Sequence, residues 1–495
     1  MEVHVQLVGR GDLAAQIYRQ LREAVLDGRL RPGERLPPSR ELAQRLAVAR
    51  NTVAVAYERL TAEGFLVGRV GSGTYVGDRF PGVPRPRSAP AGRGVRPRAV
   101  WGSVPVVPRS PAPRYDFRVG VPDPGLFPLE TWRRLVTRQL RDSTVRSTSY
   151  PDPAGHPGLR AAIARHVGVA RSVRAGADDI LVTHGAQQAF DLVGKVLLEP
   201  GDRVAVEEPG YPPVRRLFQT LGARVTGVPV DAEGLVVAAL PPDVRLVYVT
   251  PSHQSPLGVP MSLARRSALL DWARRHDAVV LEDDYDSEYR FAGRPLEPLQ
   301  SLDRHGRVIY VGSFSKTLLP MLRIGFLVAP ASLGAALATA RQLTDWHGDL
   351  PTQGALADFI NEGLLARHVR RASREYATRR ERLLSALDRH LADRLRPEPS
   401  VAGLHLCARL AVEGGPELAA SVVDRARAAG VGVESLASYC AERPGQAGLV
   451  LGYGGITAAD VEEGIRRIAA GFRSRWCGGA AGTPPTTPPS GAGVT

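Results

Sequence analysis

The sequence GSFSKTLLPMLRIGF, residues 312–326, contains Lys316, one of two lysines in a chain of 495 residues. Arginine occupies nearly every other basic position, although lysine and arginine together number 64. The stretch follows the apolar run VIYV, has serines at 313 and 315, and places Arg323 seven residues after the lysine. A guanidinium is always charged and cannot form a Schiff base. A lysine kept here therefore predicts a site that needs a reactive amine.

Four further apolar runs between residues 115 and 475 end in polar or aromatic residues. They are ILVTHGAQQAFDLVGKVLL (180–198), RVAVEEPGY (203–211), RLVYVTPSHQSPLG (245–258) and DAVVLEDDYDSEY (277–289). Longer helical patterns alternate with such runs, which is typical of an α/β domain with a mainly parallel sheet. Ligands of these sheets bind beyond the carboxyl ends of the strands.

The residues at these ends match the needs of pyridoxal 5′-phosphate, which carries an aldehyde, a ring nitrogen, an aromatic ring and a phosphate. Lys316 supplies the amine for a Schiff base, and an acid in LEDDYD can keep the ring nitrogen protonated. Gly185, Ala186 and Gln187 open a helix, whose free N–H groups favour a phosphate. Arg323 and Ser313 would return to the same phosphate.

Residues 115–475 resemble fold type I aminotransferases. The resemblance rests on FRVGVPDPGLFP (117–128), SYPDPAGHPGLRAAIARHV (149–167), VEEPGYP (206–212), LEDDYDSEYRF (281–291) and GSFSKTLLPMLRIGF (312–326). It implies that Lys316 forms the internal aldimine and Asp283 pairs with the pyridine nitrogen. It further implies that Tyr285 reaches the ring hydroxyl and Tyr211 stacks on the ring. Tyr150 would reach the phosphate of a neighbouring subunit, so the resemblance implies a homodimer.

Some residues in this region depart from the pattern or allow two interpretations. The strand-like run GLVLGYGGIT (448–457) has no arginine for a substrate carboxylate, and Arg443, Arg215 and Arg216 are loose candidates. His253 contacts the cofactor or has a structural role. Lys195 lies within a helix and is expected at the surface. Asp284 and Asp286 alternate with Asp283 and Tyr285, so we expect them to face solvent or to cap the next element.

Residues 10–77 contain a different pattern. An amphipathic helix over 13–30 precedes two short helical segments with a tight turn between them, which indicates a helix-turn-helix. The second segment begins with Arg50, Asn51 and Thr52, where such helices meet bases. Gly71, Ser72 and Gly73 form the tip of a predicted β-hairpin. The region resembles the winged helix of the GntR family, which implies that Arg40, Arg50, Thr52 and the hairpin tip contact DNA.

Residues 78–114 hold nine prolines, eight arginines and one acid, a composition that predicts an extended linker. Their net charge of +7 is half of the +14 carried by the chain, whose pI is near 10.2, and this excess predicts a polyanionic partner such as double-stranded DNA. Residues 476–495 are of low complexity and predict a disordered tail. Three widely spaced cysteines suit neither a disulfide framework nor a metal site. With no signal peptide or membrane span, we expect a cytoplasmic protein.

The order of these parts resembles the MocR-type branch of the GntR family, in which a winged helix is fused to an aminotransferase-like domain. The resemblance implies a transcriptional regulator that depends on pyridoxal 5′-phosphate (PLP) and senses PLP or a small amino compound through an aldimine. A catalytically active aminotransferase is the alternative. In a third interpretation there is no effector, and the balance of loaded and cofactor-free protein is the signal.

Overall fold

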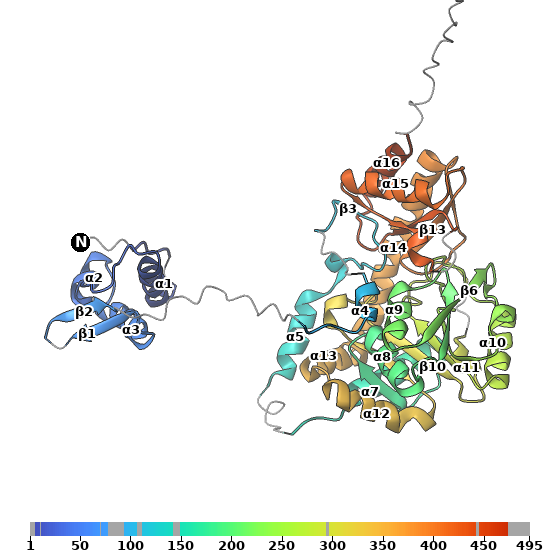
Figure 1. Cartoon of the computed structure of the whole chain (residues 1–495), viewed down its shortest axis with the longest axis horizontal. Coiled ribbons are helices and arrows are strands. Elements are labelled where there is room, and N and C mark those ends of the chain that lie inside the picture. The colour runs from blue at the N-terminus through green and yellow to red at the C-terminus, as the bar shows by residue number, and fades with distance from the viewer. Residues whose placement is uncertain are drawn as a thin grey trace, which may run out of the picture. The chain divides into compact units, whose positions relative to one another are not determined.

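The computed structural model describes residues 5–9, 11–69, 71–77, 94–105, 111–141, 149–293, 297–441 and 445–473. The chain divides into two compact units, Met1–Arg96 and Pro97–Thr495 (Figure 1). Within the described ranges, no helix has the length and apolar character that a membrane crossing requires.

The first unit is a winged helix-turn-helix, as the sequence predicted. Its elements are α1 (Leu13–Leu26), α2 (Ser39–Arg45), α3 (Arg50–Ala62), β1 (Leu66–Arg69) and β2 (Gly73–Val76). Both α1 and α2 pack against α3, and one buried cluster, which includes Ile17, Leu42 and Leu60, joins all three helices. β1 and β2 pair antiparallel as a two-stranded wing.

The second unit is built around an eight-stranded sheet, which confirms the predicted α/β class. The strand order is β4 (Ile180–Thr183), β11 (Gly325–Val328), β10 (Val308–Ser313), β9 (Val279–Asp284), β8 (Val244–Val249), β5 (Arg203–Glu208), β6 (Arg224–Asp231) and β7 (Gly234–Leu235). β11 and β7 run antiparallel to their neighbours, and the remaining adjacent pairs are parallel.

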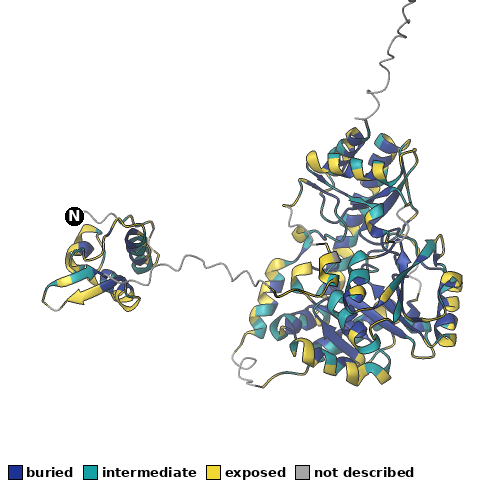
Figure 2. Ribbon diagram, in the orientation of Figure 1, coloured by how far each residue is buried: buried dark blue, intermediate teal, exposed yellow. Residues whose placement is uncertain are grey.

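Helices enclose this sheet, so strands such as β9 and β10 are buried at every position (Figure 2). The surrounding helices are α5 (Leu129–Gln139), α7 (Pro157–Arg171), α8 (Ala186–Leu197), α9 (Pro212–Thr220), α10 (Leu263–Arg275), α11 (Leu299–Leu302), α12 (Ala331–Asp345) and α13 (Leu350–Asn361). Burial on both faces explains why the strands read as continuous apolar runs rather than as alternating ones.

A smaller sheet follows the long helix α14 (Leu364–Leu391). Its order is β12 (Leu395–Pro397), β13 (His405–Leu410), β16 (Gly448–Gly452) and β15 (Glu434–Ser435). Helices α15 (Gly415–Ala428) and α16 (Val461–Arg473) pack nearby, and β14 (Val431–Gly432) pairs in parallel with β3 (Tyr115–Asp116). Their buried side chains form a core of their own, distinct from the cores that flank the large sheet.

Part of the predicted linker belongs to the second unit. Residues Val100–Ser103 form the short helix α4, which packs near α9, and Nη2 of Arg98 donates to the carbonyl oxygen of Thr220 at 2.9 Å. The stretch from Arg98 to Val104 contains no proline, so it can form a helical turn where the flanking sequence cannot. Residues 78–93, 106–110 and the predicted tail from 476 lie outside the described residues.

Candidate cofactor site and nucleic-acid interface

A cavity of about 470 Å³ lies at the carboxyl ends of the parallel strands, a volume within the usual range for small-molecule sites. Its lining joins segments that are far apart in sequence. It includes eight of the predicted cofactor residues: Ala186, Gln187, Tyr211, Asp283, Tyr285, Ser313, Lys316 and Arg323. The structure therefore places most of the predicted cofactor residues around one space.

Lys316 follows β10, and its Nζ donates to the carbonyl oxygen of Gly120 at 2.7 Å. Burial lowers the pKa of this lysine, although the nearby charges of Asp286 and Asp283 oppose the shift. A lowered pKa increases the fraction of neutral amine, which is the nucleophilic form. Gly120 has φ +76°, and a Cβ there would lie 2.5 Å from Nζ, so a side chain at position 120 would displace the amine.

Asp283 is buried near the end of β9. Its Oδ2 accepts a hydrogen bond from the hydroxyl of Tyr248 at 2.7 Å, while its Oδ1 has no partner among the described residues. Burial raises the pKa of Asp283 to about 7, and the charges of Asp284 and Asp286 add to this rise. A buried acceptor without a donor costs free energy, so this oxygen is suited to a donor from a ligand.

Another part of the cavity is formed by the start of α8 together with Arg323. Gly185 precedes the helix with φ +75°, and a Cβ there would lie 3.1 Å from Nη1 of Arg323. Arg323 donates to the carbonyl oxygen of His184, and Ser313 also lines the cavity. Free N–H groups of a first helical turn beside a guanidinium and a hydroxyl favour an anionic group.

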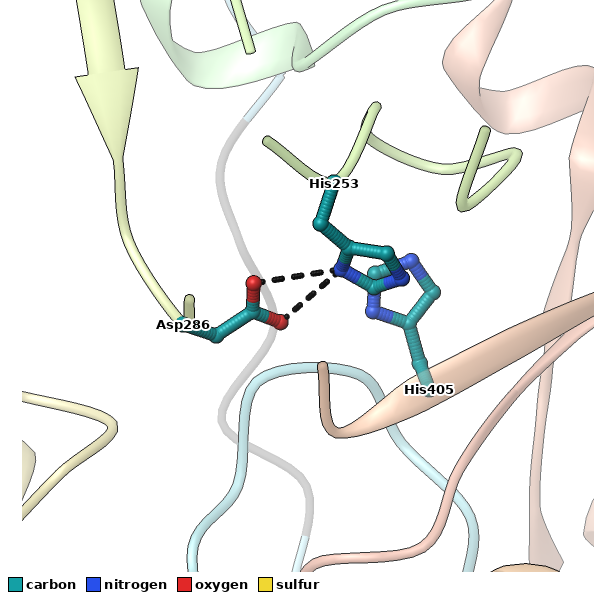
Figure 3. A group of neighbouring side chains, drawn as sticks. All are labelled: His253, Asp286 and His405. Carbon is teal, nitrogen blue, oxygen red and sulfur yellow. Dashed lines mark hydrogen bonds and ion pairs between the residues drawn. The ribbon is translucent and has the colours of Figure 1, made fainter. Parts of the chain in front are cut away.

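His253, Asp286 and His405 form a buried cluster (Figure 3). The ring of Tyr285 lies 6.0 Å from that of His253 between centroids. Nδ1 of His253 lies 3.1 Å from both carboxylate oxygens of Asp286, and Oδ2 of Asp286 accepts from the backbone N–H of Leu404 at 3.2 Å. The expectation that Asp286 faces solvent or caps an element is wrong. The carboxylate lies beyond the last residue of β9, where strand alternation no longer decides which way a side chain points.

Further contacts within this cluster define the surroundings of His253. The hydroxyl of Tyr285 donates to the carbonyl oxygen of His253 at 3.0 Å, and the His253 ring packs 4.7 Å from that of His405 between centroids. His405 lies 3.2 Å from the carbonyl oxygen of Pro256 through Nε2, and burial together with the charge of His253 keeps its pKa well below its usual value. Although three potential metal-ligand atoms lie within 4.8 Å of one another, these contacts already engage Asp286 and one nitrogen of each imidazole.

Asp284 also contradicts the expectation of a solvent-facing residue. Its Oδ2 accepts from Nε of Arg171 at 2.9 Å and from the hydroxyl of Tyr310 at 2.7 Å, and both ionic partners are buried. Burial alone would raise the pKa of Asp284, but the charge of Arg171 and these hydrogen bonds hold it below its usual value. This face of β9 is covered by α10 and α11, and at Asp284 by Arg171 of α7, rather than by water. Alternation therefore did not lead to the surface.

The remaining predicted residues, apart from Arg216, lie outside the cavity lining. Tyr150 is exposed, and its ring is tilted by 31° against that of Trp346 with centroids 4.5 Å apart. Lys195 lies on the surface of α8, where it pairs with Asp191 at 2.7 Å. Arg215 reaches the carbonyl oxygen of Tyr439, whereas Arg216 lines the cavity. Arg443 lies outside the described residues.

Sequence patterns missed several groups that the smaller sheet contributes to the cavity. Glu434 begins β15, His405 begins β13, and Ser438 and Tyr439 lie in a 3-10 turn after β15, η5 (Leu436–Tyr439). These positions lie 89 to 123 residues after Lys316, and no local motif marks them.

In the first unit, the predicted DNA-contacting residues lie on the start of α3 and on the wing. Arg50 and Asn51 are exposed in the first turn of α3, Thr52 is half-buried, and Arg40 is exposed on α2. Gly71 and Gly73 have φ +75° and +114°, a backbone that only glycine adopts readily. Both glycines of the hairpin tip are exposed.

Comparison with known proteins matches both units to established families. Residues 13–76 match the family described as bacterial regulatory proteins, gntR family, and residues 117–468 match aminotransferase class I and II. The probable rhizopine catabolism regulatory protein MocR of Rhizobium meliloti is 39% identical over 94% of both chains. The pyridoxine biosynthesis transcriptional regulator PdxR of Corynebacterium glutamicum is 34% identical over 89% of this chain and 92% of its own.

A solved structure resembles the second unit. The α-aminoadipate aminotransferase LysN of Thermus thermophilus, complexed with N-(5′-phosphopyridoxyl)-L-leucine, superposes with a TM-score of 0.66 and 32% identity over 72% of this chain and 91% of its own. Three findings agree. The N-terminal part matches a winged helix, the part after it matches an aminotransferase fold, and the regulator relatives match along nearly the whole length. The chain belongs to the MocR-type regulators of the GntR family, which join a GntR winged helix to an aminotransferase class I and II domain.

Proposed function

We propose that this chain binds operator DNA through its first unit and pyridoxal 5′-phosphate in the cavity of its second unit. An amino compound, or the cofactor itself, then controls DNA binding. The observation that carries the proposal is the convergence of Lys316, Asp283 and Arg323 on one cavity at the strand ends.

The residues present fit the cofactor. No described residue donates to Oδ1 of Asp283, and a protonated ring nitrogen would supply a donor through a charge-assisted bond. The α8 N-terminus, with Gly185, Ala186 and Gln187, suits a phosphate together with Arg323 and Ser313. When bound, the cofactor supplies an aldehyde for amines and a ring that withdraws electrons.

The chain's own residues then take distinct roles. The amine of Lys316 is the covalent attachment point, and Tyr211 provides an aromatic surface at the ring. Tyr285 presents its hydroxyl to the ring oxygen, and His253 positions that hydroxyl through its carbonyl oxygen. The exposed Tyr150 is available to the phosphate site of a second copy in a homodimer.

The two-lysine composition gives a direct test of attachment. Purified protein is incubated with pyridoxal 5′-phosphate, reduced with borohydride, and digested for peptide mass analysis. We expect the adduct on the peptide that contains Lys316 and its loss in Lys316→Ala, while Lys195→Ala behaves as the parent. An adduct on Lys195 alone, or equal labelling of Lys316→Ala, would refute the proposed site.

Control of DNA binding requires that the ligand favour one of two states of the protein. Operator affinity is therefore measured for cofactor-free protein, for loaded protein, and for loaded protein with a panel of amino compounds. A change on loading alone identifies the cofactor as the signal, whereas a change only with an amine identifies an effector. Equal affinity in all three states would exclude the second unit as a sensor.

A working aminotransferase is the second candidate, because the lysine, the ring-nitrogen acid and the anion-binding helix start are all present. Half-reaction assays with amino acids, followed by multiple-turnover assays with an oxo acid, separate the two. Fast turnover at low substrate together with no effect on DNA binding would favour the enzyme. Slow or absent turnover with ligand-dependent footprinting would favour the regulator.

A further inference from the structure

Val55 is an exposed apolar residue on α3, the helix whose first turn carries the predicted DNA contacts. Its side chain is 45% exposed, whereas Val53 and Leu60 of the same helix are buried in the core of the first unit. Valine is a poorer helix former than alanine, because its branched side chain loses rotamer freedom in a helix. At this position it adds little to the core and disfavours the helix, so neither property accounts for it.

The position of Val55 carries the argument, because single apolar side chains are common on protein surfaces. It lies four residues after Asn51, and residues at this spacing are neighbours on one face of a helix. Asn51 is exposed as well, and Arg50 precedes it in the first turn. In a helix-turn-helix, the N-terminal part of the second helix enters the major groove. Val55 is thus the second-turn residue of the face that would meet base edges.

The side chains that follow Val55 on α3 do not extend this face. Nε of Arg59 lies 3.3 Å from Oε1 of Glu63, and the guanidinium carbon lies 3.9 Å from the ring centroid of Tyr18 on α1. Arg59 is therefore directed back over the first unit. Glu58 is exposed three residues after Val55, and phosphates repel its negative charge. The DNA-facing part of α3 therefore ends near Val55.

We propose that Val55 contacts the 5-methyl group of a thymine in the major groove, and so selects a thymine·adenine pair at one position of the operator. Thymine presents this methyl group in the groove, cytosine and uracil do not, and apolar side chains recognise it by contact. The inference rests on the proposed function, since it requires that α3 enter the groove of operator DNA. It adds to that function a residue that determines which base is read.

The test uses the full-length protein and an operator obtained by selection from random double-stranded DNA. Each thymine of the selected operator is replaced singly by deoxyuridine, which removes the 5-methyl group and leaves base pairing unchanged. Affinities are measured by fluorescence anisotropy at one fixed salt concentration. We expect at least one replacement to weaken binding by the parent protein about threefold to fivefold, the effect of losing the burial of one methyl group.

Val55→Ala should bind the thymine and deoxyuridine forms of that operator with affinities within about 1.5-fold of each other, because alanine lacks the methyl groups that make the contact. Alanine is the better helix former, so the variant should fold. The matched control, Val8→Ala, removes the same atoms from an exposed valine that precedes α1. It should keep the response of the parent to deoxyuridine.

The possible outcomes separate the inference from the proposed function. A parent protein that binds every deoxyuridine form as tightly as the thymine form overturns the inference alone, whether or not Val55→Ala folds. A response to deoxyuridine that persists unchanged in Val55→Ala also overturns it, because another side chain then reads the methyl group. A selection that enriches no DNA sequence contradicts the proposed function, and the inference with it.

Discussion

Nδ1 of His253 lies 3.1 Å from both carboxylate oxygens of Asp286, and the pair is almost fully buried between the turns after β8 and β9. Gly403, which precedes β13, leaves room for the imidazole, since a Cβ there would lie 2.0 Å from Cε1 of His253. Because Leu404 also donates to Asp286, the pair connects the large sheet to the smaller one.

Loss of the imidazole should therefore destabilise the second unit. We expect His253→Ala to lower its stability by about 1–3 kcal/mol, because the carboxylate of Asp286 loses a buried donor. His253→Asn keeps an N–H near the position of Nδ1 and should lose less. Tryptophan fluorescence during urea unfolding measures this, because all five tryptophans lie after residue 96. Equal stability of the parent and His253→Ala would show that the pair contributes nothing.

The pKa of Asp283 gives the cofactor-free protein a specific pH dependence. Its value in the folded state is raised to about 7, so the stability linked to its proton is present at low pH and is lost as pH rises through 7. Asp283→Asn removes this titration. The stability of the variant relative to the parent should therefore increase between pH 5 and pH 8. Each kcal/mol of this difference corresponds to about 2–4 °C in thermal midpoint.

The comparison isolates one residue, because Glu207, Glu282 and Glu288 also have pKa values raised to about 7 by burial and titrate in both proteins. Added pyridoxal 5′-phosphate should make the parent more stable than Asp283→Asn, since its protonated ring nitrogen forms an ion pair with the carboxylate but not with the amide. Parallel pH curves for the two cofactor-free proteins would contradict this assignment.

Sequence reasoning located the cavity because parallel strands place their carboxyl ends at one edge. Motifs after β4, β5, β9 and β10 could therefore be combined without knowing the strand order. The prediction that Asp284 faces solvent was wrong, because alternation places a residue on one face of a strand but does not say what covers that face. At Asp284 the covering group is Arg171 of α7. Sequence reasoning missed His405 and Glu434, since the smaller sheet brings them to the cavity through tertiary packing alone.

The start of α3 should dominate DNA binding by the first unit. Arg50 is exposed in the first turn, so Arg50→Gln should weaken operator binding about tenfold or more, the usual cost of a lost base or phosphate contact. Arg19→Gln removes an exposed arginine of α1 and serves as the charge control. Fluorescence anisotropy with a labelled operator measures both. Equal losses for the two variants would indicate a general charge effect rather than a docked helix.

The arginines of the predicted linker, residues 78–114, predict a salt effect on DNA binding. Deletion of residues 85–98 would test them, but Arg98 contacts α9, so the deletion would also disturb the second unit. Substituting Arg85, Arg87 and Arg93 by glutamine avoids this problem. Each lost phosphate contact should lower the slope of log affinity against log salt by about 0.9, so the triple variant should lose between two and three units. A triple control at Arg274, Arg275 and Arg304, all exposed in the second unit, removes the same charge. An unchanged slope in the Arg85, Arg87 and Arg93 variant would exclude these arginines from the DNA interface.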